Sequence, residues 1–271
     1  MRNFGCETPN PAAGGPAVNE TLLLIEDDPE MRLALRMVLE DEDFKVIEAG
    51  TAAAGMEAFE RESPDLVLLD LRLPDRRGFD VCRDLRAISI VPIIIVTANT
   101  DTHDFVAGLE AGADDYVMKP VVPKALTARI RAMLRRVALE RAADEFENSE
   151  DADPTESLDD GSTNSAPRSS GRVIRLPLGI EIREDAASVT RNGEPIELTK
   201  TEFRLLCELA DHPNVVLSRD QLLERVWGYA HLGDGRLVDA HLHRLRNKIE
   251  ENPQEPQVIL TIRGIGYKLI R

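Results

Sequence analysis

Short apolar runs alternate with longer amphipathic stretches between residues 21 and 138. The short runs are rich in Leu, Val and Ile and lie at 21–25, 45–49, 65–70, 92–98 and 115–120. In the stretches between and after them, apolar residues recur every three to four positions, which is typical of helices. Strands that alternate with helices form parallel sheets, and a sheet covered on both faces has apolar strands. The pattern therefore predicts an α/β domain over 20–138 with a five-stranded, doubly wound parallel sheet.

The alternation breaks after residue 138. Residues 140–171 carry 10 acidic and 2 basic residues, are rich in Ser and have almost no apolar periodicity. Such a segment buries too little apolar surface to offset the entropy lost on ordering. We predict an acidic flexible linker over 139–171, the first residues of which can continue the preceding helix. Residues 1–19 contain no apolar central stretch and are predicted to be a disordered tail, not a secretory signal.

A different pattern begins at residue 172. Short strand-like runs precede three helical stretches at 200–212, 218–229 and 235–251. The chain then ends in a predicted hairpin that turns on Gly264 and Gly266. Strands, three helices and a terminal hairpin predict an α+β winged-helix domain over 172–271.

Charge is distributed unevenly along the chain. The net charge of −16 argues against a nucleic-acid partner only if it is evenly spread. Residues 172–271 carry 15 acidic and 15 basic residues, so the acidity lies elsewhere. No apolar run approaches the ~20 residues that cross a bilayer. The three cysteines, which are far apart, suggest neither disulfides nor a metal site. We expect a cytoplasmic protein with no membrane partner.

Polar groups stand at the ends of four predicted strands. Glu26 and Asp27 follow the first, Asp70 ends the third, Thr97 lies near the end of the fourth, and Lys119 lies near the end of the fifth. The carboxyl ends of parallel strands meet at one edge of the sheet. Clustered carboxylates repel one another unless a cation joins them, and hard oxygen ligands suit Mg²⁺. A neighbouring Lys and hydroxyl provide countercharge and a hydrogen bond for a phosphoryl group. An Asp among these groups can act as the nucleophile.

These residues occur within a recognisable arrangement of motifs. The segments LIEDDPEMR, DLVLLDLRLPDRRGFDVCRDLR, PIIIVTA and LEAGADDYVMKPVVPKAL resemble the receiver domains of bacterial response regulators. The resemblance covers about residues 20–137 and implies a flavodoxin-like fold. It also implies that a sensor histidine kinase phosphorylates Asp70. The implied Mg²⁺ ligands are Glu26, Asp27, Asp70 and the backbone carbonyl of Arg72.

The same resemblance assigns roles to three further residues. Thr97 and Lys119 would bind the phosphoryl oxygens. Tyr116 would be an aromatic switch that reorients together with the Thr97 hydroxyl, although a Tyr that only packs is the alternative. Asp28, which precedes Pro29, is interpreted as a helix N-cap and not as a metal ligand.

The resemblance also implies a phosphorylation-dependent homodimer. Receivers with winged-helix outputs pair through the fourth helix, fifth strand and fifth helix, held by intermolecular ion pairs. Two such pairs are retained here, Asp115 with Arg129 and Glu110 with Arg131. The third falls on Phe105 and Ala125, so both charges are absent together and neither is left unpaired. We expect an apolar Phe105 contact in the dimer; burial of Phe105 in its own core is the alternative.

The predicted helix that begins near Arg236 has two different faces. Val238, Leu242, Leu245 and Ile249 form an apolar stripe. The opposite side carries Arg236, Ala240, His243 and Asn247, flanked by Arg244 and Arg246. Small, amide and basic side chains suit base edges, and arginines suit phosphates. A solvated charged face is an equally good interpretation of the pattern alone.

The segments LTKTEFRLLCELADHPNVVLSRDQLLERVWG, GRLVDAHLHRLRNKIE and TIRGIGYKL resemble the winged-helix output of OmpR/PhoB-type response regulators. The resemblance implies that the 236–250 helix enters the major groove of double-stranded DNA, at paired half-sites. Arg263 would reach the minor groove and Thr261 the backbone. The loop after Trp227 (GYAHLGDG) would contact RNA polymerase. His243 stands where this subfamily commonly has Arg, which leaves base preference there open.

Two other functions are compatible with parts of the chain. A phosphohydrolase of the aspartyl-phosphate type typically has a second acid two residues after the nucleophile, where this chain has Arg72. A receiver that dimerises without phosphorylation is disfavoured by the complete set Asp27, Asp70, Thr97 and Lys119. We therefore predict a transcription regulator of a two-component system, and not an enzyme.

Overall fold

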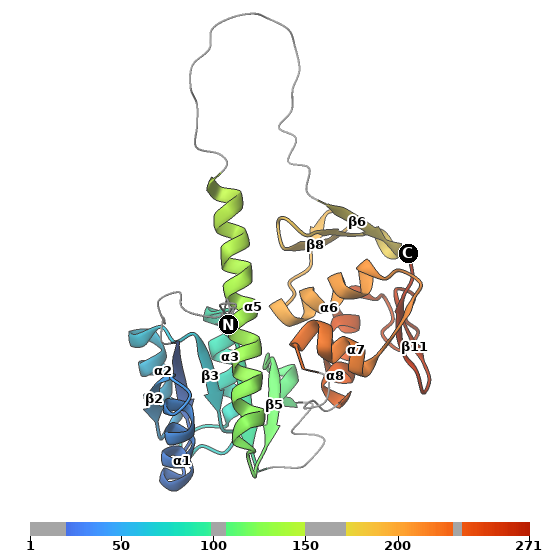
Figure 1. Ribbon diagram of the computed structural model, residues 1–271. Coiled ribbons are helices and arrows are strands. Elements are labelled where there is room, and N and C mark those ends of the chain that lie inside the picture. Colours follow the sequence, from blue (N-terminus) through green and yellow to red (C-terminus); the bar gives the residue numbers. More distant parts are fainter. Residues whose placement is uncertain (1–19, 99–106, 150–171, 230–234) are drawn as a thin grey trace, which may run out of the picture.

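A computed structural model describes residues 20–98, 107–149, 172–229 and 235–271 of the chain. The N-terminal domain contains a five-stranded parallel sheet in the order β2-β1-β3-β4-β5, which confirms the predicted α/β fold (Figure 1). Its strands are β1 (Thr21–Ile25), β2 (Lys45–Ala49), β3 (Leu66–Leu69), β4 (Ile93–Thr97) and β5 (Asp115–Met118).

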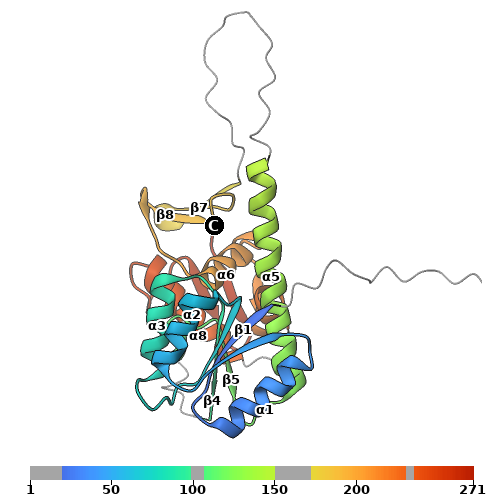
Figure 2. The ribbon, with the colours of Figure 1, turned by 90° about the vertical axis from the view of Figure 1, so that its left-hand side faces the viewer.

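Helices cover both faces of this sheet. They are α1 (Pro29–Glu40), α2 (Ala52–Glu62), α3 (Gly78–Ile88) and α5 (Pro123–Ser149), and residues 107–110 are also helical. Figure 2 shows α2 and α3 on one side of the strands and α1 and α5 on the other. Every residue of β3 and β4 is buried, because these central strands are covered from both sides.

Helix boundaries in this domain follow from local chemistry. The Asp28 carboxylate accepts from the backbone N–H groups of Glu30 (2.9 Å) and Met31 (3.3 Å), so its interpretation as an N-cap is confirmed. At the other end of the domain, α5 continues to Ser149. The helix therefore runs through the first residues of the stretch predicted as linker from residue 139.

The C-terminal domain contains two antiparallel sheets and three helical segments. One sheet has the order β6-β7-β8-β9 and the other β10-β12-β11. The strands are β6 (Val173–Leu176), β7 (Ile180–Arg183), β8 (Ser188–Arg191), β9 (Glu194–Pro195), β10 (Val216–Ser218), β11 (Ile259–Ile262) and β12 (Gly266–Leu269). The helical segments are α6 (Lys200–Asp211), α7 (Arg219–Leu222) with the π-helical turn Leu223–Trp227, and α8 (Gly235–Ile249); a short 3₁₀ turn, Pro177–Gly179, joins β6 to β7.

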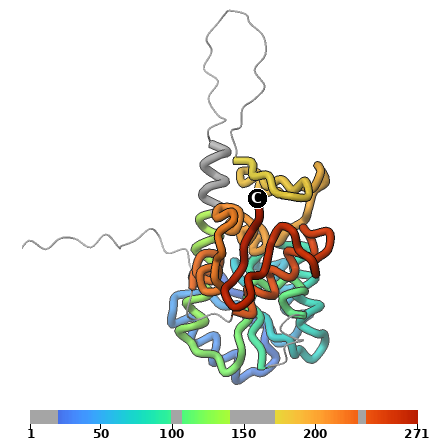
Figure 3. Tube along the Cα trace, turned by 90° about the vertical axis from the view of Figure 1, so that its right-hand side faces the viewer, coloured from blue at the N-terminus to red at the C-terminus, as the bar shows by residue number. Residues whose placement is uncertain are grey.

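The terminal hairpin forms the wing of this domain (Figure 3). Gly264 lies in its turn with φ +74°, a conformation that favours glycine. Gly266, which was predicted to share the turn, is instead the first residue of β12. A Cβ there would lie 2.0 Å from the Leu217 carbonyl oxygen, so close strand pairing explains this glycine. Among the described residues, no helix is both long and apolar enough to cross a membrane.

Candidate functional sites

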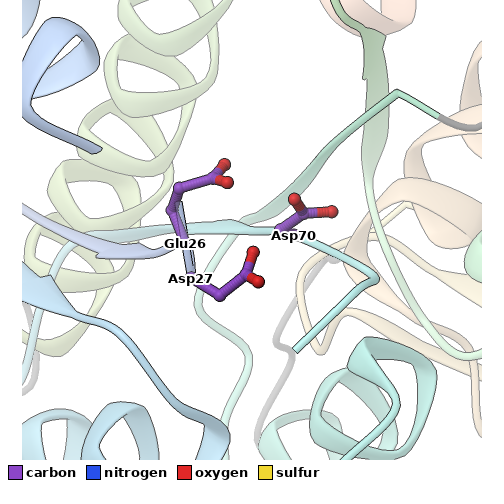
Figure 4. A group of neighbouring side chains, drawn as sticks. All are labelled: Glu26, Asp27 and Asp70. Carbon is purple, nitrogen blue, oxygen red and sulfur yellow. The ribbon is translucent and has the colours of Figure 1, made fainter. Parts of the chain in front are cut away.

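Three carboxylates lie together at the carboxyl edge of the parallel sheet. Glu26 and Asp27 follow β1 and Asp70 follows β3, and Figure 4 shows them converging. One oxygen from each lies within 4.8 Å of the others. Glu26 and Asp70 are buried, whereas Asp27 is exposed to solvent. Three hard oxygen donors, one of them accessible, fit a hydrated divalent cation such as Mg²⁺.

Lys119 joins two of these carboxylates. Its Nζ lies 2.7 Å and 2.9 Å from the two Glu26 oxygens and 2.6 Å from Asp70 Oδ2. Burial raises the pKa of Glu26 to about 7, although the hydrogen bond from Lys119 opposes the shift. Burial lowers the pKa of Lys119, but the bonds to Asp70 and Glu26 outweigh it and leave that pKa raised. The site therefore holds a positive charge against the predicted nucleophile.

The other predicted residues of this edge lie nearby. Thr97 is buried at the end of β4, and its carbonyl accepts from the Lys119 N–H at 2.9 Å. The Arg72 N–H donates to Asp70 Oδ1 at 3.2 Å. Tyr116 is buried in β5 and lies against Gly108 of the 107–110 helical segment. The peptide bond between Lys119 and Pro120 is cis.

Helix α8 exposes part of the face predicted to meet DNA. Arg236, His243 and Asn247 are exposed, and the apolar stripe on the opposite side is buried, as predicted. Ala240 differs from the prediction because it is buried. A helical wheel places Ala240 correctly on this side of the helix but does not show what covers it.

Two arginines predicted to flank the DNA face have internal partners. Arg244 forms an ion pair with Glu202 at 3.1 Å and donates to the Leu109 carbonyl of the N-terminal domain. Glu202 also pairs with Lys248 at 2.7 Å. Burial raises the pKa of Glu202, but the charges of Arg244 and Lys248 outweigh it and hold the pKa below its usual value. Arg244 therefore does not flank an open surface in this arrangement.

Arg246 and Thr261 were both predicted to contact DNA, and here they contact each other. The Arg246 guanidinium donates to the Thr261 hydroxyl at 2.9 Å and to the Ile259 carbonyl at 2.6 Å and 3.0 Å. Thr261 is exposed in β11, and Arg263 is exposed in the turn of the wing. Arg263 thus keeps the accessibility that a minor-groove contact requires.

Side chains of the C-terminal domain contact the start of β5. The Thr201 hydroxyl donates to the Asp114 carboxylate at 2.6 Å, and the Trp227 indole donates to the Asp114 carbonyl at 2.9 Å. The Tyr229 hydroxyl donates to Asp115 Oδ2 at 2.5 Å. Asp114 is also held by Arg86 at 2.6 Å. These buried contacts join the two domains, which lie side by side in Figure 1.

The predicted dimer pairs have partners within the chain. Arg129 bonds both Asp115 oxygens, at 2.8 Å and 2.9 Å, and lies 4.7 Å from the centre of the Tyr229 ring. Arg131 pairs with Glu42 at 2.6 Å, while Glu110 is exposed. Ala125 is half-buried. Phe105 lies outside the described residues, as does 230–234 within the predicted polymerase loop.

Sequence reasoning missed the contacts between the domains. None of the three side chains that make these contacts, Thr201, Trp227 and Tyr229, was predicted to bind the other domain. The one available signal was the pair of acids, Asp114 and Asp115, at the start of a predicted apolar strand. Their partners lie 87 to 114 residues away in the chain, and no local pattern identifies them.

Comparisons with known proteins agree with this two-domain arrangement. Residues 22–131 match the family "Response regulator receiver domain", and residues 193–269 match "Transcriptional regulatory protein, C terminal". The chain is 47% identical over 251 residues to the DNA-binding response regulator MtrA of Mycolicibacterium smegmatis, covering 93% of this chain and 97% of that protein. It is 44% identical over 249 residues to the transcriptional regulatory protein AfsQ1 of Streptomyces coelicolor, covering 92% and 97%.

A solved structure is similar over both domains. It is a RitR mutant, 26% identical in sequence, with a TM-score of 0.62. The likeness covers 92% of this chain and 98% of that chain. Both the order of the domains and their folds are therefore shared with a known structure.

Proposed function

Because this chain belongs to the family of DNA-binding response regulators, we propose that phosphorylation of Asp70 controls its binding to DNA through dimerisation of the receiver domain. Membership of this family implies a histidine kinase and DNA as partners. The observation that carries the proposal is the Glu26, Asp27 and Asp70 cluster with Lys119 bonded to Asp70.

The geometry of the cluster supports phosphoryl transfer to Asp70. A carboxylate oxygen of Asp70 forms the new P–O bond while the P–N bond of a phosphohistidine on the kinase breaks. Mg²⁺, held by Glu26, Asp27, Asp70 and the Arg72 carbonyl, would neutralise charge on the transferring group. Lys119 lies 2.6 Å from Asp70 Oδ2, so it can bond the oxygens of the acquired phosphoryl group.

The response to phosphorylation is assigned to Thr97 and Tyr116. Thr97 would bind a phosphoryl oxygen, and Tyr116 would reorient with it. Tyr116 follows Asp114 and Asp115 directly in the chain, and these two acids hold Thr201, Trp227 and Tyr229 of the other domain. A change at Tyr116 therefore acts on the strand residues that bind the C-terminal domain.

The arrangement in which the two domains of one chain contact each other is here called the closed arrangement. Dimerisation and the closed arrangement compete for one surface of the receiver. The receiver face proposed for pairing contains Asp115 and Arg129, and Tyr229 of the same chain covers this ion pair. We place Glu110, Arg131, Ala125 and Phe105 on the same face, with Phe105 making an apolar contact. Separation of the domains would expose this face and also free Arg244 from the Leu109 carbonyl.

For DNA, we assign the major-groove contacts to the exposed residues of α8. Arg236, His243 and Asn247 meet the bases, with Ala240 beside them, and Arg244 joins them once the domains separate. Arg263 in the wing meets the minor groove, and Thr261 the backbone. The imidazole of His243 lacks the permanent charge and the fork-shaped donor of an Arg, which points to a base preference of its own. The half-sites would be paired, and the segment after Trp227 would contact RNA polymerase.

Two further parts of the proposal rest on the chain's chemistry. A phosphohydrolase would need an acid where Arg72 stands, so we assign a regulatory and not an enzymatic role. A cytoplasmic location stays a prediction from composition. MtrA and AfsQ1, which share the two domains, are named as regulators.

Phosphorylation with a small radiolabelled phosphodonor and Mg²⁺ tests the proposal. The wild-type full chain should be labelled, and Asp70→Asn should lose labelling completely because the amide is not a nucleophile. Asp28→Asn is the matched control, since Asn also caps a helix and Asp28 lies beside the cluster. Labelling that persists in Asp70→Asn would move the phosphorylated residue elsewhere.

A further inference from the structure

A set of side chains near the end of α8, here called the recognition helix, connects this helix to the wing. Strand β11 is an edge strand, since the sheet order is β10-β12-β11. The outward N–H and C=O groups of an edge strand need partners other than a neighbouring strand. Here those partners come from two residues near the end of α8, Arg246 and Glu250.

Arg246 and Glu250 bind opposite kinds of backbone group on β11. Arg246 donates through Nε and a terminal nitrogen to the Ile259 carbonyl, at 3.0 Å and 2.6 Å. Glu250 is buried, and its carboxylate accepts from the N–H groups of Gln257, Val258 and Ile259 at 2.9 to 3.2 Å. The end of α8 thus binds the backbone of the first residue of β11 and of the two residues before it.

A second layer of contacts holds Arg246 in position. Its guanidinium carbon lies 5.6 Å from the centre of the Tyr267 ring in β12, and Arg219 lies 5.2 Å from the same ring. The Tyr267 hydroxyl donates to Asp239 Oδ1 at 2.6 Å, and Arg219 donates to the same oxygen at 2.7 Å. Asp239 belongs to α8, so two points on the recognition helix are connected to the wing sheet.

We propose that Arg246 and Glu250 are positioning residues that fix the wing, and with it Arg263, relative to the recognition helix. This inference rests on the proposed contact of Arg263 with DNA. Two of the three Arg246 nitrogens already bind the protein, and one of them also bonds Thr261. Arg246 therefore sets the distance between the major-groove and minor-groove contacts and is not primarily a ligand for a phosphate.

Charge and geometry can be separated at this position. Arg246→Lys keeps the positive charge, but one Nζ cannot reproduce the planar fork that spans the Ile259 carbonyl and the Thr261 hydroxyl. Arg246→Gln removes the charge as well. If Arg246 is only a phosphate ligand, Lys should preserve the affinity, and only Gln should lower the slope of log affinity against log salt, by about 1. If Arg246 positions the wing, both variants should weaken binding.

The experiment measures affinity and salt dependence of the phosphorylated full chain. The probe is the duplex that the wild-type protein selects from a random-sequence pool. We expect Arg246→Lys and Arg246→Gln to weaken binding by a similar factor of about ten, although only Arg246→Gln removes a charge. Wild-type affinity in Arg246→Lys, with a lower slope in Arg246→Gln, would overturn the positioning role.

A double-mutant cycle with Arg263→Gln gives the second readout. If Arg246 positions the wing, Arg246→Lys should cost little more once Arg263 is gone, so the two effects should not add. Additive effects would overturn the proposal and leave the Arg263 contact standing. Unchanged affinity in Arg263→Gln alone would remove the wing contact from the proposed function and the positioning role with it.

A further variant keeps the test independent of folding. Glu250→Gln retains the shape of the side chain and should show the same lack of additivity with Arg263→Gln. Emission from Trp227, the one tryptophan of the chain, reports whether the domain is folded. If Arg246→Lys loses that emission, Glu250→Gln carries the same cycle, since Glu250 binds the backbone at the start of β11 and has no proposed contact with DNA.

Discussion

The predicted functional side chains of the two domains have different kinds of partner. In the receiver, the residues predicted for chemistry, Glu26, Asp70 and Lys119, lie together and bind one another. In the DNA-binding domain, Arg244 and Arg246, which were predicted to contact a ligand, bind the protein itself. Backbone topology positions the residues at strand ends, whereas the contacts of residues on a helix surface depend on the elements that pack against the helix.

Two kinds of buried titratable group occur in the chain. The receiver pairs its buried acids directly, as Asp115 with Arg129 and Asp114 with Arg86 show. The DNA-binding domain buries His241 without a hydrogen-bond partner for either ring nitrogen within the described parts of the chain. Breaking a buried ion pair should therefore lower the stability directly, whereas the unpaired His241 should make the stability depend on pH.

The largest effect is expected from a substitution that breaks the Asp115–Arg129 ion pair. In Arg129→Glu, two negative charges face each other in a buried site, which should lower the free energy of unfolding by about 3–5 kcal/mol. The same variant should abolish association of the full chain in beryllofluoride, which mimics the phosphoryl group. Thermal unfolding and light scattering measure the two effects.

Arg135→Glu is the control, an exposed position on the same helix. It should change neither quantity strongly. Undiminished association in a folded Arg129→Glu protein would show that the dimer forms on another face.

The next effect in size concerns the pH dependence of His241. Burial and the charge of Arg244 lower its pKa to about 4, while Asp114 and Glu202 oppose the shift. Because the pKa is lowered on folding, His241 favours the folded state above its ordinary pKa of 6.5, and this stability is lost as pH falls towards 4. Between pH 7 and 5 the loss should be about 2 kcal/mol.

Urea unfolding followed by Trp227 emission measures this loss, since the Trp227 and His241 rings lie 5.2 Å apart. In His241→Gln the decrease between pH 7 and 5 should be smaller by that amount. His243→Gln, an exposed histidine on the same helix, should retain the wild-type decrease. Equal pH dependence in all three proteins would contradict the assignment to His241.

The smallest effect is expected from a substitution in the contact between the two domains. Thr201→Val removes the hydrogen bond to the Asp114 carboxylate, and a bond to a charged group contributes about 1.5 kcal/mol. The closed arrangement should weaken by about tenfold. We expect faster amide exchange at 114–116 and tighter DNA binding by the unphosphorylated protein.

Thr127→Val is the matched control for this variant. Thr127 is equally buried, but its hydroxyl donates to the Lys124 carbonyl within the receiver. It should leave amide exchange at 114–116 and DNA affinity near wild type. If Thr201→Val behaves in the same way, the Thr201 contact does not hold the domains together.

The sequence was most informative where function follows the order of elements along the chain. An apolar strand followed by an acid identified Glu26, Asp27 and Asp70, and strand order alone placed them at one edge of the sheet. The N-cap at Asp28 and the apolar stripe of α8 were likewise local patterns that the structure confirms. The sequence was least informative for Ala240 and Arg244, whose surroundings depend on other parts of the chain.

Both folds and the strand-end carboxylate cluster could be predicted from the sequence, because the alternation of strands with helices and the helical periodicity are patterns along the chain. The quoted motifs identified the family. Two sets of contacts could be seen only in the tertiary structure: those of Thr201, Trp227 and Tyr229 with the start of β5, and that of Arg246 with the wing. Those contacts join residues that are distant in sequence, and their partners are backbone groups or single side chains without a periodic pattern. These contacts depend on how the elements and the domains pack, and no local sequence pattern predicts that packing.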